Sequence, residues 1–296
     1  MSTIDFLQFI TNHPLNKHRK LDATLQYLKW QIGSRLVPGE VAYKWVNGSK
    51  FLVRTGETGL TGNIYTGLHE FPEMGFLLHV ITDKDLFVDV GANVGSYTLL
   101  ACSAVGARGY AFEPAPATFK RLIENVRLNH LESRVKCYNV AVGSEKSVIQ
   151  FTSDMDTVNH VIAEGEIHSN VISVEVTTLD EILLDESPTF IKIDVEGFET
   201  PVLEGATQTL NKKSLNAVIM ELNGSGNKYG YDEVKILAKM FDFGFKTYSY
   251  DPFNRELINL NGKNLNSGNT IFIREEAAIL ERVKRAPKVK IHGKSF

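Results

Sequence analysis

The chain has 296 residues, of which 43% are hydrophobic, so it is long enough to bury the core of a three-layer α/β domain. Its net charge of −3 leaves no electrostatic footprint for nucleic acid outside a short basic C-terminal segment, and no apolar run reaches the length of a membrane span. The start of the chain does not have the pattern of a secretory signal, and its two cysteines make no disulfide framework. Composition therefore predicts a cytoplasmic protein that acts on a small molecule, with no nucleic acid partner and no membrane span.

Residues 1–80 are predicted to pack on the core or to cover it. Apolar residues recur at helical spacing over residues 4–10 and again over 21–30, which indicates two amphipathic helices. Alternating apolar residues on both sides of Asn47-Gly48 predict a hairpin. The apolar faces of the two helices would rest on the core or on a second copy of the chain, so a homodimer through these helices is one expectation.

The stretch 86–95 is the most informative in the chain. Its first half is typical of a strand buried on both faces, and a loop of small residues leads from it into a helical pattern. Gly91 and Gly95 allow the loop backbone to approach a ligand, but the dinucleotide fingerprint would require glycine at Asn93. Asp89 at the strand end would repel a pyrophosphate and attract a ligand that carries an ammonium group and ribose hydroxyls.

A second acidic strand end follows about twenty residues after the loop. Residues 109–113 form a predicted strand that ends in Glu113, which would accept hydrogen bonds from two ribose hydroxyls at the same sheet edge. The alternative is that Asp89 and Glu113 only cap the helices that follow them. The two carboxylates and the glycines between them together favour S-adenosylmethionine as the cofactor. A third strand, over 134–140, would bring Ala141 against its adenine ring.

Four motifs lie along the core of the chain: VDVGANVG at 88–95, FEP at 112–114, VTTLD at 176–180 and IKIDVEGFE at 191–199. Through them, residues 86–210 resemble the FkbM-type S-adenosylmethionine-dependent methyltransferases. The resemblance implies a class I methyltransferase (Rossmann-like) α/β fold, with a doubly wound, mostly parallel sheet and an antiparallel C-terminal hairpin. It also implies methyl transfer to a hydroxyl group, often on a sugar or a secondary metabolite.

In that family the segment before the first core strand covers the cofactor. A polar loop predicted over 61–66 and a helix over 68–81 form this segment here, so Tyr65 and Glu70 are expected to line the pocket. An ordinary solvated turn is the alternative. The expected cofactor-binding residues are Asp89, Gly91, Ala92, Asn93, Gly95, Tyr97, Glu113, Pro114, Ala141, Asp194, Tyr65 and Glu70.

A predicted central strand carries charged residues on one face. Its alternation places Lys192, Asp194 and Glu196 together, and burying such groups is costly unless each is paired or serves a functional crevice. Glu221 and Asn223 share a face at the end of the next strand, and neighbouring strand ends would bring them near Asp194. The predicted catalytic chemistry therefore lies at these two strand ends.

An alcohol is a weak nucleophile, so an enzyme must remove its proton or stabilise the developing alkoxide. In one mechanism Asp194 or Glu196 accepts the proton, and Lys192 or Glu221 sets the ionisation of that base. In the other, Asp194, Glu221 and Asn223 bind Mg²⁺ or another hard divalent cation that also holds the substrate hydroxyls. The sequence leaves both mechanisms open.

Two further polar residues have a structural and a functional interpretation. His160 either reaches the site as a base or is a surface histidine, and the second interpretation is favoured. Thr178 and Glu181 have capping-box spacing, so Asp180 between them is predicted to be a first-turn acid rather than a catalyst.

Residues 81–275 are predicted to form the methyltransferase domain, with an acceptor-side insertion at 147–177, and 276–296 to form a solvated basic tail. The predicted activity is that of an O-methyltransferase, which moves the methyl group of S-adenosylmethionine to a hydroxyl of a sugar, glycoside or secondary metabolite. The alternatives are an N-methyltransferase on a small molecule or peptide and a non-catalytic S-adenosylmethionine-binding partner protein. The acidic cluster argues against the second alternative.

Overall fold

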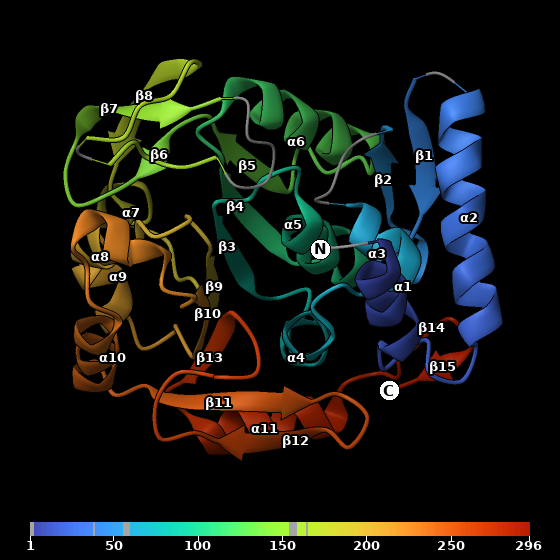
Figure 1. Ribbon diagram of the computed structural model, residues 1–296. Coiled ribbons are helices and arrows are strands. Elements are labelled where there is room, and N and C mark those ends of the chain that lie inside the picture. The colour runs from blue at the N-terminus through green and yellow to red at the C-terminus, as the bar shows by residue number, and fades with distance from the viewer. Residues whose placement is uncertain (1–2, 38, 56–59, 154–158, 164) are drawn as a thin grey trace.

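The computed structural model describes residues 3–37, 39–55, 60–153, 159–163 and 165–296 (Figure 1). Its centre is an eight-stranded sheet with the order β12-β11-β13-β10-β9-β3-β4-β5. The strands are β3 (Leu86–Val90), β4 (Arg108–Phe112), β5 (Val135–Tyr138), β9 (Phe190–Ile193), β10 (Ala217–Glu221), β11 (Lys246–Asp251), β12 (Glu256–Asn259) and β13 (Asn269–Ile273). The five strands from β5 to β10 pair in parallel, whereas β13 runs antiparallel to both β10 and β11. The predicted sheet, mostly parallel with antiparallel C-terminal strands, is confirmed.

The register of the parallel strands aligns their carboxyl ends. Val90 pairs with Phe112 on one side and with Ile193 on the other, and Ile193 pairs with Met220. Each of these four residues is followed directly by Gly91, Glu113, Asp194 or Glu221. One row along a single sheet edge therefore holds the glycine loop and three of the predicted acidic residues.

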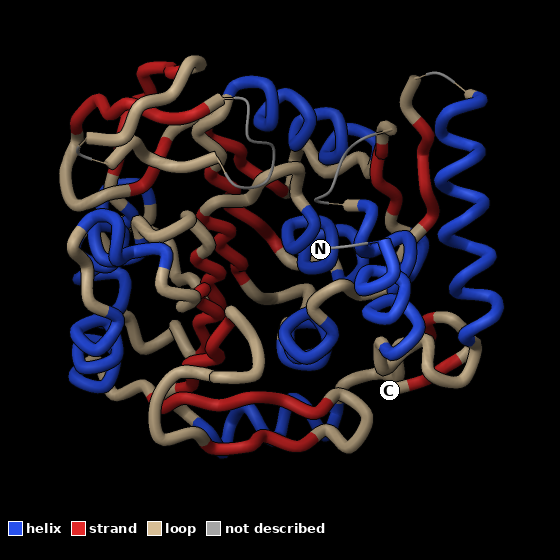
Figure 2. Tube along the Cα trace, viewed as in Figure 1, coloured by secondary structure: helices blue, strands red, loops and turns tan. Residues whose placement is uncertain are grey.

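Helices cover both faces of the sheet, because successive strand residues point to opposite sides and both sides are apolar. Phe87 and Phe190 belong to one core, and their neighbours Val88 and Ile191 belong to the other. Figure 2 shows the strands between helices on the two sides. The first side carries α4 (Phe71–Val80), α5 (Ser96–Leu99), which continues as the π-helical turn η2 (Leu100–Val105), and α6 (Pro116–Leu128); the other carries α7 (Leu179–Ile182), α8 (Glu199–Glu204), α9 (Thr207–Asn211) and α10 (Glu233–Asp242).

The N-terminal segment contains both of its predicted helices and the hairpin. These are α1 (Thr3–Asn12), α2 (Lys20–Leu36), and the antiparallel pair β1 (Val41–Lys44) and β2 (Lys50–Val53), joined by the 3₁₀ turn η1 (Val46–Gly48). Ile10 and Phe51 are fully buried in the core that covers the first face of the sheet. One apolar stripe of α2 stays exposed, formed by Leu21, Leu25, Leu28, Ile32 and Leu36. The homodimer through these helices stays a prediction.

The polar loop predicted over 61–66 is wrong, because the structure has a short helix there, α3 (Thr61–Thr66), with every residue buried. The solvated tail predicted over 276–296 is also wrong. Its first part is α11 (Glu276–Arg285), whose Ile279 and Val283 are one helical turn apart and buried, and its end is the hairpin of β14 (Lys290–Ile291) and β15 (Lys294–Ser295). The last residue, Phe296, packs edge-on against Phe71 with ring centroids 5.1 Å apart.

The acceptor-side insertion pairs with the preceding strand β6 in a small three-stranded sheet with the order β6-β8-β7. Its strands are β6 (Ala141–Val142), β7 (Ser147–Thr152) and β8 (Val171–Thr177), and it lies beside the carboxyl edge of the large sheet (Figure 1). Phe151 and Val161 belong to a separate small core with Ala141. Among the residues that the structure describes, no helix combines the length and the apolar character needed to cross a bilayer.

Candidate active site

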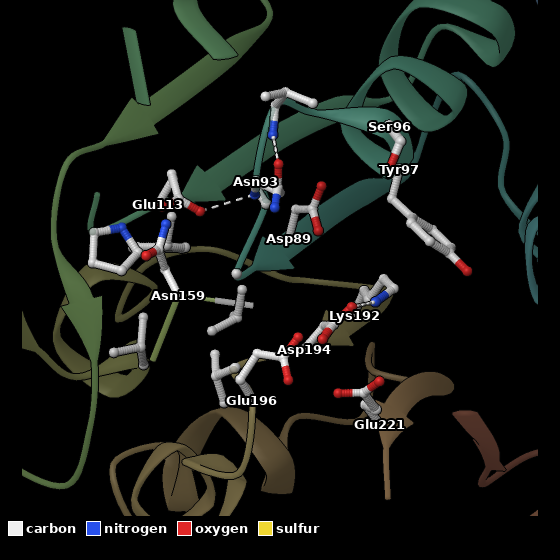
Figure 3. Close-up of a pocket in the computed structure, with 18 of the residues that line it drawn as sticks. Asp89, Asn93, Ser96, Tyr97, Glu113, Asn159, Lys192, Asp194, Glu196 and Glu221 are labelled. Carbon is white, nitrogen blue, oxygen red and sulfur yellow. Dashed lines mark hydrogen bonds and ion pairs between the residues drawn. The ribbon is translucent and has the colours of Figure 1, made fainter. Parts of the chain in front are cut away.

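A cavity of about 320 Å³ lies along the carboxyl edge of the large sheet (Figure 3). The loop after β3 forms its floor, the ends of β4, β9 and β10 supply its acidic groups, and α3, α4 and the insertion form its walls. Ten of the predicted cofactor-binding residues line it: Glu70, Asp89, Gly91, Ala92, Asn93, Tyr97, Glu113, Pro114, Ala141 and Asp194. The four predicted catalytic residues, Lys192, Asp194, Glu196 and Glu221, line it as well.

Glu113 lies at one end of the cavity and is held by backbone donors. Its Oε2 accepts a hydrogen bond of 3.0 Å from the N–H of Asn93, and its Oε1 accepts one of 2.9 Å from the N–H of Ala115. Burial raises the pKa of Glu113 to about 7. Each carboxylate oxygen keeps a second acceptor position, so the group is oriented to receive two hydroxyl donors from the cavity.

Asp89 supports the helix after the glycine loop and also lies in the cavity lining. Its Oδ2 accepts hydrogen bonds of 2.9 and 2.5 Å from the backbone N–H and the hydroxyl of Thr98, so it orders the first turns of the helix after the loop. It also lines the cavity while only 2% of its surface is exposed. Burial raises the pKa of Asp89 to about 6. The carboxylate therefore supports the loop and presents negative charge to the cavity.

The glycine loop brings two strand ends into direct contact. Gly91 has a φ of +78°, and a Cβ atom on it would lie 1.7 Å from the carbonyl oxygen of Asp194. A side chain at this position would thus separate the loop after β3 from the end of β9. Asn93 has a φ of +51° and stabilises the turn by accepting a hydrogen bond of 2.8 Å from the N–H of Val94. Gly95, directly before α5, has a φ of +95° and is not among the lining residues.

The other end of the cavity carries a dense acidic cluster. Oxygen atoms of Asp194, Glu196 and Glu221 lie within 4.8 Å of one another. The buried Nζ of Lys192 lies 2.6 Å from Oδ2 of Asp194 and 4.6 Å from the ring centroid of Tyr97. One lysine faces three carboxylates, so the cluster must hold protons or attract a cation.

Burial, together with the charge of Asp194, raises the pKa of Glu196 to about 7 and that of Glu221 well above its usual range. Oε2 of Glu221 is buried with no hydrogen-bond partner among the described residues. Burial by itself would lower the pKa of Lys192, but Asp194 and Glu70 outweigh it and hold that pKa above its ordinary value. A charged lysine beside a cluster in which Glu196 exchanges its proton near neutral pH is suited to moving a proton.

The cluster forms differently from the prediction. The sequence pattern predicted a strand that continues through Glu196, but β9 ends at Ile193, and Glu196 has a φ of +53°. Glu196 thus reaches the cluster through a left-handed turn rather than through strand alternation. Gly197 follows with a φ of +101°, and a Cβ atom there would lie 2.6 Å from the backbone of Ser225. The neighbouring loop fixes this turn, so the periodicity of the local sequence could not predict it.

Two predicted side chains lie outside the cavity lining. Tyr65 points toward the N-terminal helices, where its hydroxyl accepts a hydrogen bond of 3.0 Å from Gln31, and Asn63 of the same helix lines the cavity instead. Asn223 is exposed and accepts a hydrogen bond of 2.8 Å from the N–H of Ser225. Tyr65 was predicted in a loop but lies in the helix α3. Asn223 was predicted to share a strand face with Glu221, but β10 ends at Glu221.

His160 is neither a surface histidine nor a lining residue. It is 6% exposed, and its Nε2 lies 2.9 Å from Oε1 of Glu166. The surface interpretation is wrong, because the ring is buried beside Glu166 and His168. Asp180 lies in the first turn of α7, as predicted, and its carboxylate also accepts hydrogen bonds from the N–H groups of Gln208 and Thr209 at the start of α9.

The sequence did not identify several residues that form the walls of the cavity. These come from α3, α4 and the insertion: Asn63, His69, Met74, Phe151, Asn159 and Val161. Glu70 connects this wall to the floor, because it accepts hydrogen bonds of 2.6 Å from the hydroxyl of Tyr97 and 2.6 Å from Nδ2 of Asn269. No local pattern could have identified these residues, since each is placed by packing between distant segments.

The mostly parallel sheet, the glycine loop and the two acidic strand ends define a Rossmann-like methyltransferase. The sequence matches the model of the methyltransferase FkbM domain over residues 89–247, which is more than half of the chain. The chain belongs to the FkbM methyltransferase family.

Two relatives with similar sequences are also named as methyltransferases. The hexuronic acid methyltransferase AglP of Haloferax volcanii is 34% identical over 151 residues, which is 50% of this chain and 59% of that relative. Methyltransferase 1 of Beauveria bassiana is 27% identical over 195 residues, 57% of this chain and 77% of the relative. The crystal structure of methyltransferase FkbM from Methylobacillus flagellatus superposes with a TM-score of 0.44 and 18% identity, over 65% of this chain and 44% of that one.

Proposed function

We propose that this methyltransferase uses S-adenosylmethionine to methylate a hydroxyl group of a sugar or glycoside. The observation that carries the proposal is the row of acidic groups along one sheet edge, from Glu113 after β4 to Glu221 at the end of β10 (Figure 3). These two residues are separated by three strand spacings, which is about 14 Å. That distance is sufficient for a nucleoside at one end and an acceptor at the other.

The residues of the first end fit the cofactor. Glu113, held by two backbone N–H groups, would accept the ribose hydroxyls, and Asp89 would attract the ammonium group. Val140, Ala141 and Val142 give the cavity an apolar wall beside Glu113, as an adenine ring requires. S-adenosylmethionine supplies, when bound, a methyl group on a positively charged sulfur.

The residues of the second end fit a hydroxyl acceptor. Glu196 is the best base, because burial raises its pKa to about 7, and a base of that pKa is half ionised at neutral pH. Asp194 is held by Lys192 and would orient the acceptor, while Glu221 carries its own proton or shares one. In this arrangement the acceptor hydroxyl gives its proton to Glu196 as its oxygen becomes a nucleophile.

The charge of the cluster also bears on the acceptor. With Glu221 protonated and Asp194 paired with Lys192, the ionised form of Glu196 leaves the acceptor end negative, and such a surface repels an anionic acceptor over short distances. A neutral sugar hydroxyl therefore fits this end better than a sugar carboxylate. The similarity to a relative named for hexuronic acid supports a carbohydrate acceptor in general.

A divalent cation is the second candidate for the same cluster. Three carboxylate oxygens within 4.8 Å of one another are the hard ligands that Mg²⁺ prefers, and Glu196 would take the place predicted for Asn223. Turnover that falls at least about tenfold after chelation with EDTA and returns with Mg²⁺ would support this candidate. Turnover that EDTA leaves unchanged would support proton transfer to Glu196 alone.

Two measurements test the proposal. The first is calorimetric titration with S-adenosylmethionine. The second is the release of S-adenosylhomocysteine in the presence of neutral glycosides, uronic acids or amines. We expect cofactor binding and turnover with a neutral glycoside. A folded protein with no affinity for the cofactor would refute the proposal, and turnover restricted to amines would favour an N-methyltransferase. Tight cofactor binding without turnover on any acceptor would favour the non-catalytic partner.

A further inference from the structure

A second group of potential metal ligands lies in the insertion, apart from the acidic cluster. The Nε2 atoms of His160 and His168 lie 2.9 and 2.8 Å from the same oxygen, Oε1 of Glu166. One ligand atom from each of the three residues lies within 4.8 Å of the others. Nothing in the methyl-transfer chemistry proposed above uses these residues.

The three side chains are held in this arrangement by the surrounding backbone. Oε2 of Glu166 accepts a hydrogen bond of 2.9 Å from the N–H of Ala163, which directs Oε1 toward the two rings. The N–H of His160 donates to the hydroxyl of Thr152 at the end of β7, over 2.9 Å. Only 8% of the His160 side chain and 21% of the His168 side chain are exposed. The cluster is thus built into the protein and is not a chance meeting of surface groups.

We propose that His160, Glu166 and His168 form a zinc site. Two imidazole nitrogens and one carboxylate oxygen are a common ligand set for Zn²⁺, whereas Mg²⁺ and Ca²⁺ prefer oxygen ligands to imidazole nitrogen. Tetrahedral zinc with bonds of about 2.1 Å would separate these ligand atoms by about 3.4 Å. The observed separations of 2.8 and 2.9 Å need to open by roughly half an ångström, which small rotations of the His168 ring and of the Glu166 carboxyl group supply. Water would complete the coordination.

The position of the site gives it a structural effect. Asn159 and Val161, the neighbours of His160 in sequence, both line the cavity, so an ion bound at His160 would anchor this wall. Ile167, the neighbour of Glu166 in sequence, is 93% exposed and does not anchor Glu166 to an apolar core. A metal bound by His160, Glu166 and His168 would tie Glu166 and His168 to the buried His160.

Calorimetric titration of Zn²⁺ into the full chain, after treatment with a chelator and desalting, tests the site. We expect one Zn²⁺ per chain with a Kd at or below about 1 μM, unaffected by excess Mg²⁺. His168→Gln and Glu166→Gln should each weaken binding at least about tenfold, because even the loss of an outer-shell partner has that effect. His130→Asn is the matched control, because His130 is exposed and asparagine tolerates its positive φ.

A second control separates this site from the acidic cluster. Glu221→Gln removes a carboxylate from that cluster, and it should leave zinc binding as in the parent protein. Circular dichroism and thermal unfolding of each variant show whether the fold is retained, independently of any methyltransferase activity. The proposal is overturned if the parent binds no zinc, or if His168→Gln and Glu166→Gln bind it as the parent does.

Discussion

Glu113→Ala tests the assignment of the cofactor end most directly. The carboxylate is expected to accept two ribose hydroxyls, and hydrogen bonds to a charged group contribute about 1.5–3 kcal/mol each. The N–H groups of Asn93 and Ala115, which now bond to Glu113, would regain water in the open cavity of the variant. A net loss of about 3 kcal/mol corresponds to an increase in the Kd for S-adenosylmethionine of about 100-fold.

The same residue predicts how cofactor affinity depends on pH. Burial raises the pKa of Glu113 to about 7, so the free protein gains the acceptor form of this carboxyl as the pH rises through neutrality. Affinity for S-adenosylmethionine should therefore increase between about pH 6 and about pH 8, and Glu113→Ala should flatten that increase. Asp89, with a pKa raised to about 6, titrates mostly below this range.

Isothermal titration calorimetry at both pH values measures these effects, with Glu132→Ala as a control at an exposed glutamate. The control should bind the cofactor as the parent does. If Glu113→Ala binds S-adenosylmethionine within about twofold of the parent near pH 8, with unchanged thermal unfolding, the reasoning about the ribose contact is refuted.

Further predictions concern the acceptor end, the loop and the N-terminal helices. Asp194→Asn should abolish methyl transfer and spare cofactor affinity, as steady-state rates and calorimetry would show; normal rates would contradict its role. If Glu196 is the base, kcat should rise with pH around its pKa of about 7, since only the ionised carboxyl accepts a proton, and a flat profile would exclude it. Gly91→Ala should lower the free energy of unfolding in urea by at least about 2 kcal/mol, because a side chain there strains the backbone and meets the carbonyl of Asp194. An unchanged urea midpoint would count against that contact. Replacement of the exposed Leu28 and Ile32 by glutamate should convert a dimer to a monomer in light scattering, and a monomeric parent would dispose of the predicted homodimer.

The functional end of each core strand could be predicted from local sequence because each signal is contained in a few residues. The apolar run before Asp89, the glycines after it and the acidic end at Glu113 are features of single strand-loop units. The capping-box spacing that assigned a structural role to Asp180 is also local, and the structure confirms it. Alternation of strands and helices was sufficient to predict the mostly parallel sheet.

Tertiary structure alone decided which side chains meet across the cavity. Asn63 rather than Tyr65 lines it because α3 packs into the core, and Glu196 enters the acidic cluster through a left-handed turn that the neighbouring loop imposes. Residues 276–285 form α11, which packs on the core through the buried Ile279 and Val283. The basic composition of this segment did not predict that packing. Local patterns report burial and capping within one element, whereas the contacts that build a site depend on the register and packing of elements distant in the chain.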